Sequence, residues 1–235
     1  MELAEVPSAE ILYQEGVEKL EGGTSFLFFD STDYRGAIDI FQDIVDNYPY
    51  SEYAVLAELR IADAYFEQEL WEEALSYYRD FSELHPNHER VPYTVFRSAL
   101  CHTHQMRGPG RDQTSTRRAL EYLDRVMTQY PYSPEAGEAE AMWKDLRSRL
   151  GRHVMGIGEF YLAREEYQSA ADRFRSVLND YPGLGLDAEA LYKLGVCYSK
   201  MHLDDEAARV FQVILQNYEG SDVAAAAQGW VPSAN

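Results

Sequence analysis

The 235-residue chain has few basic residues, no long apolar run and only two cysteines. Its 21 Lys and Arg stand against 40 Asp and Glu, which gives a formal net charge of −19. Nucleic acid and anionic membrane surfaces are therefore unfavourable main partners, because both are bound through basic surfaces. No stretch approaches the roughly 18 apolar residues of a membrane-spanning helix. The first residues show neither the basic start nor the apolar run of a signal peptide.

The two cysteines, Cys101 and Cys197, lie far apart and outside the spacings of metal or redox motifs, so we expect free, buried thiols. The motif CHTH places Cys101 and His104 on one helical face, but zinc needs at least three ligands and no further one is near. No phosphate-binding loop, catalytic triad or paired-carboxylate motif is present. We predict a chain without metal or cofactor that is not an enzyme.

An internal repeat runs along the chain. Each of five segments has a small Ala followed four residues later by a large apolar side chain, and closes twelve residues after the Ala, in four cases with proline. Residues at i and i+4 share a helical face, the small one admits a neighbouring helix, and proline ends the helix. This period predicts an all-α, right-handed solenoid of about five tetratricopeptide (TPR) helix pairs. The Ala and apolar pairs are Ala37 and Phe41, Ala74 and Tyr78, Ala119 and Leu123, Ala170 and Phe174, and Ala207 and Phe211.

The repeats predict a single domain over residues 8–222, followed by a flexible tail over 223–235. No turn signal appears between about Pro134 and Gly151, so we expect one long helix of roughly 30 residues there. The repeats themselves span about 8–49, 50–86, 87–131, 132–182 and 183–219.

Two repeats have extra residues between their helices. The distance from the small residue of the first helix to the Ala of the second is 12 residues in three repeats, but 21 from Gly16 to Ala37. The third repeat has a similar excess. We predict insertions at 24–32 and 108–115.

The first insertion contains four consecutive large apolar residues, Phe26, Leu27, Phe28 and Phe29. They either pack over their own repeat or form an exposed tip that contacts a partner or the lipid surface. The sequence leaves both alternatives open.

Three stretches resemble the BamD family, the TPR lipoproteins of the outer-membrane β-barrel assembly machine. HPNHERVPYTVFRSAL (85–100) is similar to the junction of the family's second and third repeats. RDQTSTRRALEYLDRVMTQYPYSPEA (111–136) resembles its Asp-Gln-Thr loop and the following helix. GEFYLAREEYQSAADRFRSVLNDYP (158–182) is similar to its fourth repeat. The resemblance covers roughly residues 8 to 222.

This resemblance implies a non-enzymatic scaffold on the periplasmic face of the outer membrane. Family members bind the last POTRA domain of BamA mainly through C-terminal repeats, and bind other small lipoproteins in some lineages. Their N-terminal groove is thought to receive the C-terminal targeting strand of unfolded outer-membrane proteins. They are held by lipids on an N-terminal cysteine, so we expect membrane contact only through an N-terminal lipid anchor absent from this chain.

The repeat register predicts which side chains line the concave groove of the first three repeats. The set is apolar and aromatic and would suit an extended peptide with alternating aromatic residues. The alternative is that about half of these side chains pack between repeats. The predicted groove residues are Tyr13, Val17, Leu20, Leu56, Leu59, Asp63, Phe66, Tyr93, Phe96 and Leu100.

Arg173 matches the position at which the family has an arginine implicated in BamA contact. The alternative is a surface arginine paired with Asp172 or Glu166. Two other functions remain open at this point: a different periplasmic TPR protein, or a cytosolic TPR adapter that binds peptides or proteins.

Overall fold

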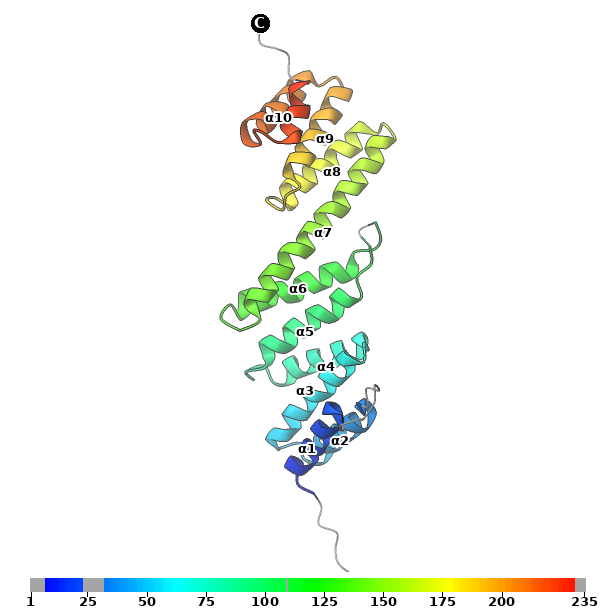
Figure 1. Ribbon diagram of the computed structural model, residues 1–235, viewed down its shortest axis with the longest axis vertical. Helices are drawn as coiled ribbons and strands as arrows, with labels where there is room; N and C mark the ends of the chain where they lie inside the picture. Colours follow the sequence, from blue (N-terminus) through cyan, green and yellow to red (C-terminus); the bar gives the residue numbers. More distant parts are fainter. Residues whose placement is uncertain (1–6, 23–31, 109, 231–235) are drawn as a thin grey trace, which may run out of the picture. The chain divides into compact units, whose positions relative to one another are not determined.

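The computed structural model describes residues 7–22, 32–108 and 110–230, and every regular element in these ranges is an α-helix (Figure 1). From α1 to α5, and again from α8 to α11, each helix packs on the next along the chain. The predicted all-α fold of helix pairs is confirmed. The helices are α1 (Ala9–Glu21), α2 (Tyr34–Asn47), α3 (Glu52–Glu67), α4 (Trp71–Leu84), α5 (Val91–His104), α6 (Thr114–Gln129), α7 (Ala136–Ala163), α8 (Tyr167–Asp180), α9 (Asp187–Lys200), α10 (Asp204–Asn217) and α11 (Asp222–Gln228).

The repeat pattern has a direct steric basis in the contact between glycine and aromatic side chains. A Cβ atom built on Gly16 would lie 2.6 Å from Phe41 Cε1, and one built on Gly158 would lie 2.6 Å from Phe174 Cε1. Both rings are fully buried. The first helix of each of these repeats therefore approaches the second so closely that only glycine fits, which is the role that the sequence pattern predicts for the small residue.

The chain separates into two compact units. One comprises the residues up to 106 together with 117–140, and so contains α1 to α5, most of α6 and the start of α7. The other comprises 107–116 and the residues from 141 onward. The sequence predicts a single domain over 8–222. Because a repeat in a solenoid contacts only its neighbours, such a chain can form more than one compact unit.

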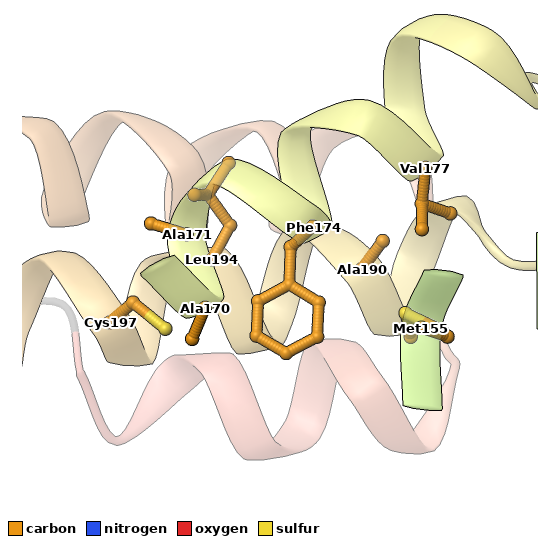
Figure 2. Close-up of a cluster of buried hydrophobic side chains, with 8 residues drawn as sticks. All are labelled: Met155, Ala170, Ala171, Phe174, Val177, Ala190, Leu194 and Cys197. Atoms are coloured by element: carbon orange, nitrogen blue, oxygen red, sulfur yellow. The ribbon is translucent and has the colours of Figure 1, made fainter. Parts of the chain in front are cut away.

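The core of the second unit is a cluster contributed by α7, α8 and α9 (Figure 2). Phe174 is fully buried within it, together with Ala170, Cys197 and other side chains labelled in the figure. Small residues from α8 and α9 surround the ring, so the space between the helices is filled by one large side chain.

Helix α7 confirms the prediction of one long helix, since it extends over 28 residues. Its length comes from the absence of any turn signal between the third and fourth repeats. No helix in the described ranges is both long and apolar enough to span a bilayer.

The prediction of a flexible tail over 223–235 is wrong for its first part, which forms helix α11. Ser221 caps this helix by accepting a hydrogen bond from the backbone N–H of Ala224 at 3.1 Å. Ala224 and Ala227 are buried against the preceding repeat, and the Trp230 ring stacks on Phe211 with centroids 5.5 Å apart. The Ala-rich segment is ordered because its small residues pack onto α10. Residues 231–235 lie outside the described part.

Helix α1 is joined to the residue that precedes α2, across the first predicted insertion at 24–32. Lys19 Nζ donates to Asp33 Oδ2 at 2.9 Å, and the backbone N–H of Asp33 donates to the Lys19 carbonyl at 3.1 Å. Asp33 also caps α2 by accepting from the Gly36 N–H. Phe26, Leu27, Phe28 and Phe29 lie outside the described residues, so their contact with a partner or membrane remains a prediction.

The segment predicted as the second insertion folds around a buried glutamine. Gln113 Nε2 donates to the carbonyls of Gly108 and Arg111, each at 3.0 Å, and its Oε1 accepts from Thr116 Oγ1 at 3.1 Å. Gln113 is only 2% exposed. The side-chain amide therefore adds to the backbone hydrogen bond from the Arg111 N–H to the Gly108 carbonyl, and it ties this loop to the start of α6.

Candidate functional site

The candidate site is a polar and aromatic surface on the first helices of the first three repeats, α1, α3 and α5. Its centre is Asp63 on α3. Asp63 Oδ1 accepts two short hydrogen bonds, from Tyr78 Oη at 2.6 Å and from Tyr93 Oη at 2.8 Å. Because Tyr78 belongs to α4 and Tyr93 to α5, one carboxylate connects three helices.

A second set of contacts surrounds Arg97, which lies one turn after Tyr93 on α5. Its Nε donates to Tyr78 Oη at 3.0 Å, and its Nη2 donates to Glu67 Oε1 at 3.2 Å. The guanidinium carbon lies 3.5 Å from the centroid of the Phe66 ring. The Arg97 side chain is 16% exposed, so this stacking is largely withdrawn from water. Cation–π stacking is stronger under those conditions than at an open surface.

Two more rings extend the aromatic part of the site. The Trp71 and His104 rings stack in parallel, 4.1 Å apart with an interplanar angle of 5°. Both pack edge-on to Phe66, Trp71 at 4.9 Å and His104 at 5.6 Å. His104 therefore has an aromatic packing role.

The site continues to α1 through Tyr13. Arg60 Nε donates to Tyr13 Oη at 3.0 Å, and the Tyr13 ring lies 5.5 Å from that of Tyr53. We use the name first-helix face for this surface, whose polar members are Tyr13, Arg60, Asp63, Glu67, Tyr93 and Arg97.

The two tyrosines at Asp63 remain protonated. Burial raises the pKa of both Tyr78 and Tyr93 well above the ordinary phenol range, and the neighbouring Asp63 charge adds to the effect. Both hydroxyls therefore act as donors to the carboxylate at any physiological pH. Neither tyrosine hydroxyl gains or loses a proton near neutral pH. This suits a structural or binding role for the two hydroxyls better than acid–base catalysis.

The predicted groove residues fall into two groups. Leu59, Phe66 and Phe96 are buried, so they pack within the fold. The other members are partly buried, and they remain candidates for contact with a bound segment. These partly buried members are Tyr13, Val17, Leu20, Leu56, Asp63, Tyr93 and Leu100.

Sequence reasoning missed Arg97, Trp71 and His104 as members of this surface. A signal for Arg97 was present: Asp63 and Glu67 are four residues apart on α3, and Tyr93 and Arg97 are four apart on α5. Two acidic residues one turn apart thus face a hydroxyl and a cation at the same spacing on the next first helix. The ring contacts of Trp71 and His104 join α4 to α5 and have no such signature.

Arg173 on α8 is exposed and forms no ion pair within the described residues. The alternative partner Asp172 is instead bound by Arg175, whose Nη2 lies 2.6 Å from Asp172 Oδ1. The guanidinium of Arg173 is therefore available to a partner. Contact with BamA remains a prediction.

Nothing in the described part of the chain brings three or more His, Cys, Asp or Glu side chains together as metal ligands would be. Cys101 of the CHTH motif is buried, and burial raises the pKa of its thiol to about 12. With His104 stacked on Trp71, the two residues do not form a ligand pair.

Comparison with known proteins gives consistent matches. The family model described as "YfiO: Outer membrane lipoprotein" matches residues 7–214. The chain is 28% identical over 211 residues to the outer membrane protein assembly factor BamD of Caulobacter vibrioides, covering 90% of this chain and 66% of that protein. It is also 28% identical over 210 residues to BamD of Rickettsia prowazekii, covering 89% of this chain and 80% of that protein.

Among solved structures, the TPR2AB domain of yeast Sti1 in its pHSP90 complex matches with a TM-score of 0.52. The match covers 94% of this chain and 83% of that chain at 13% sequence identity. At this identity the likeness shows the fold alone, and it confirms a TPR architecture.

Proposed function

We propose a function from one premise: this chain belongs to the YfiO family of outer membrane lipoproteins. Membership confirms the resemblance to BamD and places the chain at the outer membrane as a non-enzymatic TPR scaffold. From this premise the chain is a scaffold of the outer-membrane β-barrel assembly machine, at the periplasmic face. The observation that carries the proposal is the family match over residues 7–214.

The first partner in this proposal is the POTRA domain of BamA, contacted through the C-terminal repeats. Arg173 supports this contact because it is exposed and without an ion-pair partner among the described residues, on a chain of net charge −19. An acidic patch on the partner would gain a pairing that the chain itself does not satisfy. Other Bam lipoproteins are further partners in the same machine.

The test is a titration of the chain against the BamA periplasmic region of the same organism, comparing wild type with Arg173→Glu. Arg175→Glu is the matched control, since it changes the same charge two residues away on the same helix but removes a pairing with Asp172. We expect Arg173→Glu to weaken binding by about tenfold and Arg175→Glu by much less. Equal binding by all three proteins would remove Arg173 from the interface, and no binding by wild type would favour a different TPR adapter.

The second partner is the targeting strand of unfolded outer-membrane proteins, bound along the first-helix face. Its partly buried aromatic residues offer apolar contact, and the hydroxyl, carboxylate and guanidinium groups offer hydrogen bonds to an extended backbone. Asp63 and Tyr93 are fixed by the hydrogen bond between them, and Arg97 by its hydrogen bonds to Tyr78 and Glu67, so little side-chain entropy is lost on binding.

Site-specific photocrosslinking tests this contact. A crosslinking amino acid at Arg60, which is exposed on α3, is expected to capture an unfolded β-barrel protein. The same amino acid at Glu73, exposed on α4, is the control and is expected to capture none. Equal capture at both positions would contradict binding along the first-helix face.

A further inference from the structure

A second feature of the first unit is the row of turns that join one repeat to the next. The turns after α2, α4 and α6 lie along one side of this unit, at the left in Figure 1, whereas the turn after α3 lies on the opposite side. Each of these inter-repeat turns closes through a backbone hydrogen bond from its fourth residue to its first, so they share one shape. The bonds run from Ser51 to Tyr48 at 2.9 Å, from His88 to His85 at 3.0 Å and from Ser133 to Tyr130 at 3.0 Å.

Two of these turns present a tyrosine to solvent. Proline is the second residue of each turn and fixes its φ angle, so the third residue projects from a rigid base. Tyr50 and Tyr132 occupy this third position, and their relative exposures are 102% and 100%. The same position after α8 and α10 holds Gly183 and Gly220. The exposed rings thus belong to the first unit, and little conformational entropy is lost when a partner covers them.

Two aliphatic side chains extend the row of rings. Leu84, the last residue of α4, is 68% exposed, and Ile11, in the first turn of α1, is 60% exposed. A single exposed apolar side chain is ordinary, but four along one side of a unit form a candidate contact surface. We use the name turn edge for this surface, whose members are Ile11, Tyr50, Leu84 and Tyr132.

The N-terminal segment enters the fold at the turn edge. Tyr48 Oη donates to the Pro7 carbonyl at 2.7 Å, which holds residue 7 beside the turn that contains Tyr50. Ser8 then caps α1 by accepting from the N–H of Ile11 at 3.3 Å. The chain belongs to a family of outer membrane lipoproteins, whose members are held by lipids at the N-terminus. Such an anchor would bring this side of the first unit to the membrane surface.

The charges around the turn edge select the kind of lipid. Glu10 and Glu52 lie in the first turns of α1 and α3, and Glu83 and Glu89 flank the turn after α4. Arg90 is a cation next to the same turn, so carboxylates predominate. An anionic lipid surface would repel this edge, whereas phosphatidylethanolamine is zwitterionic and offers an ammonium group to the carboxylates.

We propose that the turn edge rests on a bilayer of zwitterionic phospholipid, with the rings of Tyr50 and Tyr132 among the headgroups. Tyrosine is enriched at this depth because its ring is apolar and its hydroxyl is polar. Leu84 and Ile11 would add apolar area to the same contact. The inference rests on the proposed attachment at the outer membrane, and it adds a protein surface that sets the orientation of the first unit on the lipid.

The contact is weak by itself and becomes effective in an anchored chain. Its few side chains bury less apolar area than an amphipathic helix would, so a free chain would bind vesicles poorly. A lipid anchor on the segment before Pro7 raises the effective concentration of the edge at the membrane to the order of millimolar. A weak contact is populated under those conditions.

The test measures which side of the first unit faces the lipid. The whole chain, with a hexahistidine tag at its N-terminus in place of the lipid anchor, is bound to vesicles of phosphatidylethanolamine and phosphatidylcholine that contain a nickel-chelating lipid. A bimane dye is attached at Glu89→Cys, beside the turn edge, or at Glu73→Cys, at the start of α4 on the opposite side; both positions are exposed. Cys101 and Cys197 are buried, so the introduced thiol takes the dye. A lipid with a nitroxide on its headgroup quenches dye that lies near the surface.

We expect stronger quenching at position 89 than at position 73. The double variant Tyr50→Ser/Tyr132→Ser should lower the bound-to-free ratio of the turn edge by about tenfold or more, because two rings leave the contact. Leu70→Ser, next to the start of α4 on the opposite side, is the matched control and should leave the quenching at position 89 unchanged. Replacing phosphatidylethanolamine by phosphatidylglycerol should weaken that quenching, since carboxylates face the lipid. Circular dichroism verifies that each variant is folded.

Equal quenching at the two positions, or unchanged quenching at position 89 in the double variant, would overturn the proposal. Stronger quenching at position 73 would overturn it in favour of lipid contact on the side of the predicted insertion at 24–32. Stronger quenching with phosphatidylglycerol would overturn the assignment to zwitterionic lipid. A double variant that binds the BamA periplasmic region about tenfold more weakly in solution would assign the turn edge to a protein partner instead. The Arg173→Glu titration uses no vesicles, so the BamA contact and the lipid contact can fail independently.

Discussion

Substitution of Gly158 by alanine tests the close approach of α7 and α8 that underlies the repeat. The new Cβ would lie 2.6 Å from Phe174 Cε1 and 3.0 Å from both Cδ1 and Cζ of the same ring. Phe174 is fully buried among α8 and α9, so it has little room to move. Overpacking of this kind costs about 1–3 kcal/mol. Alanine regains about 1 kcal/mol of helix propensity, so we expect a net loss of up to about 2 kcal/mol in the free energy of unfolding.

Gly156 provides the matched control, two residues earlier on the same helix. A Cβ atom at Gly156 would meet no atom within 4 Å. Gly156→Ala should therefore stabilise the chain by up to about 1 kcal/mol, through helix propensity alone. Glycine-to-alanine substitution is thus expected to lower the free energy of unfolding at position 158 of α7 and to raise it at position 156.

Urea unfolding followed by far-UV circular dichroism measures both effects. Tryptophan fluorescence is a second probe, because Trp143 and Trp230 belong to the same unit as Gly158. The difference in stability between each variant and wild type is calculated from the urea concentrations at the unfolding midpoints, provided that the m-value is unchanged. A Gly158→Ala protein as stable as the Gly156→Ala protein would refute the steric basis of the repeat.

Three further predictions concern other parts of the chain. Tyr78→Phe should lower the free energy of unfolding by about 1.5–3 kcal/mol, because the Asp63 carboxylate loses the hydrogen bond that the Tyr78 hydroxyl donates to it. Tyr50→Phe is the control, since the Tyr50 side chain is fully exposed, and it should change the free energy by less than about 0.5 kcal/mol in the same urea titration. Cys101 and Cys197, whose pKa values burial raises to about 12 and about 11, should resist iodoacetamide at about pH 8 in native protein and react only in denaturant, as mass spectrometry would show. Gln113→Ala should lower the free energy of unfolding by about 1–3 kcal/mol, since the buried Thr116 hydroxyl loses its acceptor and two loop carbonyls lose a hydrogen bond. Gln113→Glu would test whether the amide N–H is the needed group.

Much of the fold could be predicted from the sequence because its signals are local. Alanine and aromatic residues four apart, with proline eight residues after the aromatic one, mark a helix and its end without reference to the rest of the chain. The glycine opposite Phe174 could be identified in the same way, since its distance from Ala170 is constant among regular repeats. The spacing that marks a helix and the position of the close-contact glycine can both be read within a single repeat.

The candidate site was harder to predict because it depends on contacts between repeats. Register places Leu59, Asp63 and Phe66 on the first-helix face, but it does not say which side chain the next helix covers. The structure buries Leu59 and Phe66 and leaves Asp63 partly exposed. Likewise, the alanines of α11 have no amphipathic pattern, and their burial depends on the shape of α10.

The most direct test of the scaffold function is a depletion experiment in the organism of origin. The amount of folded β-barrel protein in the outer membrane is measured after the chain's own gene is switched off and complemented with wild type, Arg173→Glu or Arg175→Glu. We predict that depletion lowers the folded β-barrel proteins, that wild type and Arg175→Glu restore them, and that Arg173→Glu restores them less. Unchanged β-barrel levels after depletion would contradict a role in outer-membrane assembly.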